Sequence, residues 1–349
     1  MAKTHSLKIK EVVRETADAI TIHFQQPLLR KISYKPGQFL TLTVPVNGKT
    51  LYRSYSLCSA PKLDKTLAVT VKRVENGVVS NFLNDHVKAG KKMEIAEPSG
   101  RFTIENTVKD QRHVVLIGGG SGITPLMSIM RSTLFNEPKS KVSLVYANRN
   151  EASVIFKDAL KELQGKFPDR LHLQHFLSQP AAGDSIEHQT GRLTAETVSS
   201  LVKELPFEGN GSSVYYICGP NGMMEVAEAG LKAAGIPEAS ILQEHFVVEE
   251  VERKVVGEGV KPVTLIFDGD THELLVDPSH TILEAAMEQG LYLPYSCQSG
   301  ICSTCMGKVH QGTVEMDNNE SLTDEDLDEG YVLLCQAHPT SDDVKVEVE

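Results

Sequence analysis

The stretch CQSGICSTC, residues 297–305, concentrates three of the chain's six cysteines within nine residues. Its spacing is Cys297-x4-Cys302-x2-Cys305, and Cys335 follows after 29 further residues, at the end of the apolar run YVLLC. Thiols stay reduced inside cells, where clustered cysteines bind metal more often than they form disulfides. The stretch therefore predicts a metal site around which this part of the chain must fold.

The local spacing of the three clustered cysteines is typical of a plant-type [2Fe–2S] centre, in which four thiolates hold two irons. Gly300 and the small serines of the loop allow the backbone to pass close to the inorganic sulfides, where its N–H groups can bind the sulfurs. A zinc site remains open, because His338 could complete a Cys3His set, and so does a group of free thiols. The residues expected to bind the metal are Cys297, Cys302, Cys305 and Cys335.

The charge of the chain is unevenly distributed. Residues 262–349 contain 2 Lys or Arg against 18 Asp or Glu, a formal charge of −16 within a chain whose net charge is −11. The remaining residues therefore carry +5. This asymmetry indicates that 262–349 form a separate unit, and its acidic surface argues against nucleic acid as a partner.

The pattern of apolar residues divides the chain into three folded parts. Short alternating stretches such as LTLTV at 40–44, broken by Gly and Pro, predict a small antiparallel β-barrel in the first part. Strands such as HVVLI at 113–117 then alternate with helices, which predicts a parallel sheet with helices on both faces. The third part begins with two alternating strands joined at Asp268-Gly269, which is typical of a hairpin turn.

The expected fold class is multidomain: an all-β domain, then an α/β domain, then an α+β domain. The expected boundaries are 1–108 for the barrel, 109–248 for the parallel-sheet domain, 249–261 for a charged linker and 262–349 for the last domain. No run of about 18 apolar residues occurs, so no membrane span is expected. The start, MAKTHSLKIKEVVRE, has no apolar signal-peptide core, so we expect a cytoplasmic location.

Residues 262–349 resemble a plant-type ferredoxin domain through PYSCQSGICSTCMGKVHQG at 294–312 and LLCQAHP at 333–339. The resemblance implies the β-grasp fold and a [2Fe–2S] cluster on the four cysteines. Such a cluster carries one electron at a time, so another group in the chain must supply electrons singly.

The tetrapeptide Arg53-Ser54-Tyr55-Ser56 resembles the flavin-binding RxYS motif of the ferredoxin–NADP reductase superfamily. The resemblance implies FAD, with Arg53 on its pyrophosphate, Tyr55 against the isoalloxazine ring and Ser56 near N5. Tyr55 and Ser56 are therefore expected to be catalytic. Taken alone, the four residues could be an ordinary strand segment, and the neighbouring motifs favour the flavin site.

The segment that starts at Asn76-Gly77 would complete the flavin site. In the superfamily this loop binds the FAD pyrophosphate through backbone N–H groups and a serine at a helix N-terminus. The superfamily often has two glycines here, whereas this chain has Asn76-Gly77. Lys72 could equally be a solvated strand residue. The further residues expected to bind FAD are Val71, Lys72, Gly77, Val79 and Ser80.

GGGSGITP at 118–125 lies between a strand and a helix, with Thr124 expected as the N-cap. It differs from the G-x-G-x-x-G fingerprint and resembles the superfamily's GGGxGxTP nicotinamide motif. CGPNGMM at 218–224 resembles the companion motif, whose cysteine lies near nicotinamide C4, so Cys218 is an expected catalytic residue. Cys218 could otherwise be a buried strand cysteine, and Phe246, expected to cover the flavin, could be a core aromatic.

Two residues after the strand 141–147 bear on the choice of nicotinamide cofactor. A carboxylate at this position would bind the ribose of NADH, whereas an arginine would accept the 2′-phosphate of NADPH. Arg149 favours NADPH, and the nearby Glu151 keeps NADH open. The residues expected to bind the nicotinamide dinucleotide are Gly119, Gly120, Gly122, Thr124, Asn148, Arg149, Cys218, Gly219, Pro220, Met223 and Phe246.

The order of the three parts, over essentially the whole chain, resembles the reductase components of bacterial multicomponent oxygenases, of the phenylacetyl-CoA epoxygenase and ketosteroid hydroxylase type. The resemblance implies that NAD(P)H reduces FAD and that electrons pass singly through the [2Fe–2S] cluster to an oxygenase component. A fatty-acid desaturase or another acceptor is an alternative partner. A redox sensor without enzymatic activity is an alternative function.

Overall fold

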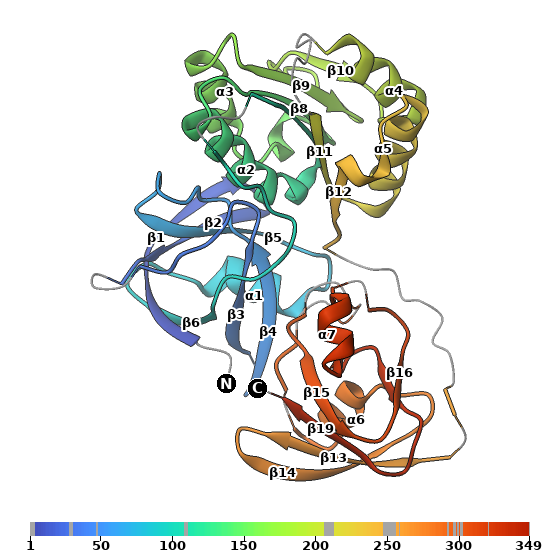
Figure 1. Ribbon diagram of the computed structural model, residues 1–349. Coiled ribbons are helices and arrows are strands. Elements are labelled where there is room, and N and C mark those ends of the chain that lie inside the picture. Colours follow the sequence, from blue (N-terminus) through green and yellow to red (C-terminus); the bar gives the residue numbers. More distant parts are fainter. Residues whose placement is uncertain are drawn as a thin grey trace.

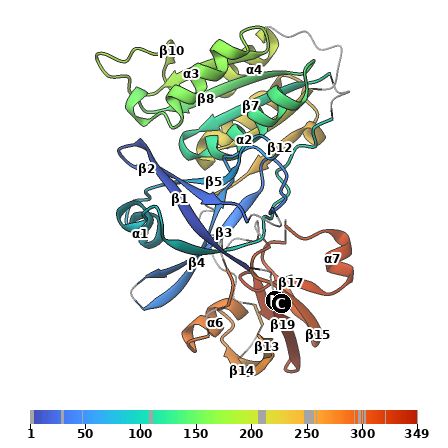
Figure 2. The same cartoon turned by 90° about the vertical axis from the view of Figure 1, so that its left-hand side faces the viewer.

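The computed structural model describes residues 4–27, 31–46, 48–107, 111–205, 213–246, 256–257, 259–291, 293–295, 298, 300, 303–319 and 321–348. These residues form three parts that follow one another along the chain: a barrel (β1–β6), an α/β domain (β7–β12) and a C-terminal domain (β13–β19). In both ribbon views the barrel lies between the other two parts (Figures 1 and 2).

The barrel is an antiparallel sheet in the order β4-β3-β6-β1-β2-β5. Leu57, just beyond β4, bridges to Val69 of β5, so the two edges of the sheet meet and the barrel closes. Alternate residues such as Ile20, Ile22 and Phe24 point inward and are at most 2% exposed. The elements are β1 (Thr4–Thr16), β2 (Ala19–Gln25), β3 (Phe39–Val46), β4 (Lys49–Ser56), β5 (Thr66–Lys72), α1 (Val78–His86) and β6 (Lys92–Ala96).

The α/β domain is a parallel sheet in the order β10-β9-β8-β7-β11-β12, as the sequence pattern predicts. Helices α2 and α3 pack on one face, and α4 and α5 pack on the other. The strands are β7 (His113–Gly119), β8 (Lys141–Asn148), β9 (Leu171–Leu177), β10 (His188–Thr190), β11 (Ser213–Cys218) and β12 (Ile241–Glu244). The helices are η1 (Gly120–Gly122), α2 (Ile123–Asn136), η2 (Glu151–Ser153), α3 (Lys157–Lys166), α4 (Ala195–Glu204), α5 (Asn221–Ala233) and η3 (Glu238–Ser240).

Helix α2 begins earlier than the sequence predicts. Gly122 is its N-cap, because the 3₁₀ turn η1 runs directly into the helix. Thr124 lies inside the first turn, where its Oγ1 donates to the carbonyl of Ser121 at 3.0 Å. The expectation that Thr124 caps the helix is therefore wrong.

The barrel has its own hydrophobic core, and some of its residues also pack into the core of the α/β domain. Arg131 of α2 binds Asp64 of the barrel through two hydrogen bonds of 2.6 and 2.9 Å, and Ser128 Oγ donates to the carbonyl of Ser59 at 2.6 Å. Because both carboxylate oxygens of Asp64 accept from the guanidinium of Arg131, this bidentate pair has a defined geometry. The two parts are therefore held in a defined relation to each other. Barrel residues packed in the core of the α/β domain are Ala19, Cys58, Ala68, Phe102 and Ile104.

The C-terminal domain has a mixed sheet in the order β14-β13-β19-β15-β17 and a small sheet of β16 and β18. Asp268 and Gly269 have φ of 53° and 84° and form the predicted hairpin turn between β13 and β14. In the expected linker, 249–255 and 258 lie outside the described residues, and Lys261 already belongs to β13. The elements are β13 (Lys261–Phe267), β14 (Asp270–Val276), α6 (Ile282–Glu288), β15 (Met306–Gln311), β16 (Val314–Met316), α7 (Asp324–Asp328), β17 (Tyr331–Leu333), β18 (Ala337–Pro339) and β19 (Val344–Val348).

Candidate functional site

A cavity of about 780 Å³ lies where the three parts meet. Its wall is built from β4 and the start of α1 in the barrel, from η1, α2 and the segment at the end of β12, and from loops of the C-terminal domain. The residues that line it include Arg53, Ser54, Tyr55, Ser56, Lys72, Gly77, Val78, Val79, Ser80, Ser121, Thr124, Glu244, Phe246, Gln298, Ser303 and Ser321. The structure thus brings most of the predicted flavin residues to one cavity.

The RxYS segment lies on β4, which pairs with β3. Arg53 and Tyr55 occupy alternate positions of the strand and therefore share a face. Burial raises the pKa of the Tyr55 hydroxyl, with Arg53 acting in the opposite direction, so this group stays neutral at physiological pH. The Ser54 hydroxyl lies 2.9 Å from that of Thr41 on the neighbouring strand. The segment therefore presents a cation and a neutral aromatic ring to the cavity.

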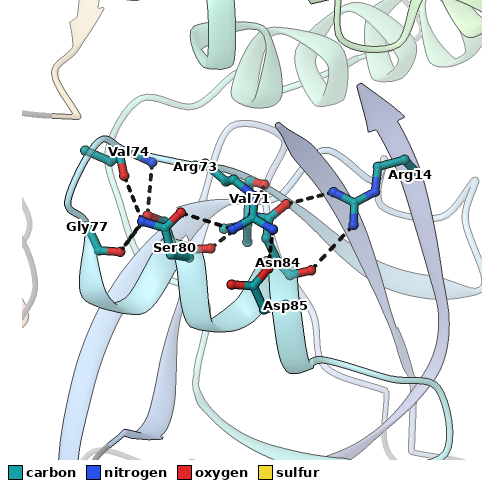
Figure 3. A network of polar contacts seen from close by, with 9 residues as sticks. Arg14, Val71, Arg73, Val74, Gly77, Ser80, Asn84 and Asp85 are labelled. Carbon is teal, nitrogen blue, oxygen red and sulfur yellow. Dashed lines mark hydrogen bonds and ion pairs between the residues drawn. The ribbon is translucent and has the colours of Figure 1, made fainter. Parts of the chain in front are cut away.

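Asn84, in the last turn of α1, holds the helix against β5 (Figure 3). Its Nδ2 donates to the carbonyls of Val71 at 3.1 Å and Ser80 at 3.0 Å, and its Oδ1 accepts from Arg14 at 3.2 Å. Arg73 pairs with Asp85 on the same helix. Val71 is itself fully buried in the barrel and is not among the described residues of the cavity wall. These contacts hold α1 against β1 and β5 of the barrel.

The N-terminus of α1 faces the cavity without a side-chain cap. Gly77 is the N-cap residue, and the first turn contains no acidic residue. A Cβ on Gly77 would lie 2.6 Å from Ser80 Oγ and 2.9 Å from Val74 Cβ, so only glycine fits. The Ser80 hydroxyl accepts from the Val74 N–H at 3.1 Å and so stabilises the turn. Uncapped N–H groups at a helix start are suited to an anion such as a pyrophosphate.

The glycine loop after β7 packs against the CGP loop after β11, at the point where the strand order reverses. A Cβ on Gly122 would lie 2.0 Å from the carbonyl oxygen of Cys218. One on Gly119 would lie 2.7 Å from Met223 Sδ and 2.9 Å from Pro220 Cδ. Similarly, a Cβ on Gly219 would lie 2.9 Å from the Gly119 nitrogen. Contact between the two loops therefore requires these glycines, and a crevice at such a switch point is where nucleotides bind in parallel sheets.

Cys218 lies at the end of β11, beside the cavity. Its side chain is fully buried, burial raises the pKa of its thiol, and it is not one of the described residues that line the cavity. Lys72 does line the cavity, and its Nζ lies 3.6 Å from Asp18 Oδ2. Gly120 has φ of 52° and lies beside Lys72. Phe246, expected to cover the flavin, is 37% exposed and lines the cavity.

Glu244 is a candidate functional residue that the sequence analysis did not identify. It pairs in register with Cys218 across β11 and β12, and Ser56 Oγ donates to its Oε2 at 2.9 Å. Burial raises the pKa of Glu244 to about 8, so its carboxyl group is protonated at neutral pH. A carboxyl group with a raised pKa in a cleft indicates a functional site. The signal in the sequence was QEHF itself, because it places an acidic residue at the end of the strand that runs directly into Phe246.

Asn148 and Arg149 lie at the carboxyl end of β8, apart from the described cavity wall. The Glu151 carboxylate accepts from the backbone nitrogens of Ser185 and Ile186, the second at 3.1 Å. These bonds lower the pKa of Glu151 to about 2. Glu151 is therefore engaged by protein donors, whereas the Arg149 side chain is exposed.

Cys305 and Cys335 come together in the C-terminal domain. Both side chains are buried, at 2% and 6% exposure, and the N–H of Leu334 donates to the carbonyl of Cys305 at 3.0 Å. Cys297 and Cys302 lie outside the described residues. His338, the potential zinc ligand, has its Nε2 2.9 Å from Asp317 Oδ2.

Three family profiles match the chain in succession. They are an oxidoreductase FAD-binding domain over 6–104, an oxidoreductase NAD-binding domain over 116–229 and a 2Fe-2S iron-sulfur cluster binding domain over 265–340. These matches confirm the prediction of FAD, a nicotinamide cofactor and a [2Fe–2S] cluster rather than zinc.

No helix within the described residues is long and apolar enough to cross a membrane.

Relatives from oxygenase systems are similar to this chain over nearly their full length. One component of the 1,2-phenylacetyl-CoA epoxidase of Escherichia coli is 38% identical over 100% of this chain and 99% of its own length. The ferredoxin reductase component of 3-ketosteroid-9-alpha-monooxygenase from Mycolicibacterium smegmatis is 40% identical, over 97% and 96% respectively. The structure of phthalate dioxygenase reductase has the same fold, with a TM-score of 0.62, 21% identity and coverage of 99% and 98%.

Proposed function

The chain belongs to the reductase components of oxygenase systems, and we propose that it supplies electrons to an oxygenase of ring-containing substrates, as the two relatives' names indicate for them. It is an oxidoreductase with FAD-, NAD- and [2Fe–2S]-binding domains, which passes electrons from a nicotinamide dinucleotide to a partner oxygenase. We further propose a cytoplasmic location, because thiolate cluster ligands persist in a reducing compartment.

The observation that carries this proposal is that all three parts line one cavity. Its volume of about 780 Å³ lies within the range of cofactor sites. The fit to FAD rests on the uncapped N-terminus of α1, the glycine at position 77 and the Tyr55 ring. FAD, when bound, accepts a hydride and releases electrons one at a time, which lets a two-electron donor serve a one-electron acceptor.

We propose the following roles for the cavity residues. Arg53 and the N–H groups of Val78 and Val79 hold the pyrophosphate, and Tyr55 supports the ring system. Ser56 and Glu244 lie beside the buried Cys218, on the side from which the nicotinamide enters at the switch point. The protonated carboxyl group of Glu244 holds a proton next to the Ser56 hydroxyl, so this pair can exchange a proton with the reacting ring system.

We also propose that NADPH is the preferred donor. Glu151 is the carboxylate nearest the end of β8 in the sequence, and backbone donors already occupy it. Arg149 is exposed at the same strand end and can accept a 2′-phosphate. Replacing Arg149 by alanine should raise the KM for NADPH about tenfold to a hundredfold, the value of a charged hydrogen bond, and leave that for NADH nearly unchanged.

Lys166 provides a matched control for Arg149. It is a cation at the end of α3, on the side of the sheet where the strands begin, and it packs over Phe135. Lys166→Ala should leave both KM values unchanged. Equal KM values for the two dinucleotides in the parent protein, or an Arg149→Ala variant with unchanged NADPH binding, would contradict the proposed preference.

The electron route can be tested with two artificial acceptors. The loaded protein should reduce both ferricyanide and cytochrome c, and we expect ferricyanide to take electrons from the flavin and cytochrome c to take them from the iron–sulfur centre. Cys335→Ser should lose cytochrome c reduction and the cluster absorption but keep flavin and ferricyanide reduction. A flavin-loaded protein that oxidises neither NADPH nor NADH would refute the proposed function.

A further inference from the structure

The described contacts between the barrel and the C-terminal domain include an aromatic group and an ion pair. The Tyr52 ring on β4 meets the Tyr295 ring edge-on, with centroids 6.4 Å apart and an interplanar angle of 69°. The guanidinium carbon of Arg53 lies 5.4 Å from the centroid of the Tyr295 ring. Arg101 of the barrel pairs with Asp326 of α7 at 3.1 Å. Tyr52 packs against the core of the C-terminal domain, although it belongs to the barrel.

These contacts lie next to the predicted cluster loop. Tyr295 is two residues before Cys297 in the sequence, and its side chain is only 2% exposed. Gln298 and Ser303, on the described part of the same loop, line the cavity together with Arg53. Through its contacts with Tyr52 and Arg53, Tyr295 therefore connects the barrel wall of the cavity to the segment that leads into the cluster motif.

The aromatic contact is well suited to a fixed position. Arg53 donates to the carbonyl of Tyr52 at 2.7 Å, so the guanidinium is held over the Tyr295 ring by its own strand. An edge-on aromatic pair and a cation over a ring both have directional preferences. The Arg101–Asp326 pair is more exposed, with Arg101 at 55%, and solvent weakens it.

We propose that Tyr52, and to a lesser degree Asp326, are positioning residues for the transfer of electrons from the flavin to the [2Fe–2S] cluster. This proposal rests on the proposed function of the cavity. In each turnover the nicotinamide dinucleotide gives up a hydride, so the flavin gains two electrons. Each later transfer oxidises the flavin by one electron and reduces the iron pair by one. The rate of that step falls steeply with distance. Tyr52 is not among the described residues of the cavity wall, so hydride transfer should not depend on it.

The test compares variants of the fully loaded protein by rapid mixing with NADPH under anaerobic conditions. Flavin bleaching reports hydride transfer, and the electron paramagnetic resonance signal of samples frozen at successive times reports cluster reduction. Tyr52→Ala should slow cluster reduction at least tenfold, while flavin bleaching, ferricyanide turnover and the amounts of both bound cofactors stay at parent values. Tyr52→Phe keeps the ring and should restore the parent rate.

The ion pair has its own matched variants. Asp326→Asn should slow cluster reduction about two- to fivefold, because it removes the charge that pairs with Arg101. Asp328→Asn removes the same charge from an exposed position of α7 and should have no effect.

Three results would overturn the proposal. The first is cluster reduction at the parent rate in Tyr52→Ala. The second is an equal fall in flavin bleaching and cluster reduction, which would place Tyr52 in the flavin site. The third is an equal effect of the two α7 variants. Failure of the proposed function would look different, because the parent protein itself would then show no flavin bleaching.

Discussion

Replacing Glu244 by glutamine should alter how the stability of the protein depends on pH. In the parent protein burial raises the pKa of Glu244 from 4.5 to about 8. Between these values the unfolded chain releases the proton and the folded chain keeps it. The folded state therefore binds more protons, and the contribution of Glu244 to stability falls as pH rises from about 4.5 to about 8. Glutamine has no such proton and removes the slope.

The size of the effect follows from the same pKa values. A difference of one bound proton between the folded and unfolded states changes the free energy of unfolding by about 1.4 kcal/mol per pH unit. From pH 4.5 to pH 7 the free energy of unfolding of the parent therefore falls by about 3 kcal/mol through Glu244. Glutamine has nearly the same shape, and its amide oxygen can still accept from Ser56. The free energy of unfolding of the variant, relative to that of the parent, should therefore increase by about 3 kcal/mol between pH 4.5 and pH 7.

The assay is urea unfolding of both proteins at pH 5, 6, 7 and 8, followed by circular dichroism. The quantity of interest is the difference in free energy of unfolding between variant and parent at each pH. Other titrating groups are common to both proteins and cancel in this difference. A difference that stays constant from pH 5 to pH 8 would refute the reasoning, because the buried carboxyl group would then ionise like an exposed one.

Four further substitutions have expected outcomes. Glu151→Gln should change the pH dependence of stability in the opposite direction to Glu244→Gln. The pKa of Glu151 is lowered to about 2, so its contribution to stability is present above pH 4.5 and disappears as the pH falls towards 2. Unfolding curves of both proteins in acid should show that the variant is destabilised above pH 4.5 and that this difference disappears towards pH 2. Gly122→Ala should destabilise by about 1–3 kcal/mol or more in thermal unfolding, because its Cβ would lie 2.0 Å from the Cys218 carbonyl oxygen. Gly222→Ala, in α5 with nothing within 4 Å, should be neutral or slightly stabilising. Asn84→Ala should cost about 1–3 kcal/mol and weaken flavin retention, since it removes two bonds to the carbonyls that position α1, and flavin release on dilution measures this.

Much of this protein follows from local pattern alone. The alternation of apolar and polar residues in stretches such as 40–44 predicts the barrel, because this period buries one face of a strand. The succession of strand and helix patterns after 113 predicts the parallel sheet. The spacing of Cys297, Cys302 and Cys305 likewise predicts a cluster loop. Each of these features depends on residues within a few positions of one another.

The tertiary structure decided what depends on distant residues meeting. Glu244 becomes a candidate proton-holding group only because Ser56, 188 residues earlier, lies 2.9 Å away and the surrounding protein desolvates the carboxyl group at the cavity wall. Gly122 must be glycine because another loop, carrying Cys218, packs onto it. The seating of Tyr295 on Tyr52 joins two domains whose separate sequences contain no sign of the contact. Burial and approach are properties of the packed chain, and they set pKa values and distances that no local pattern encodes.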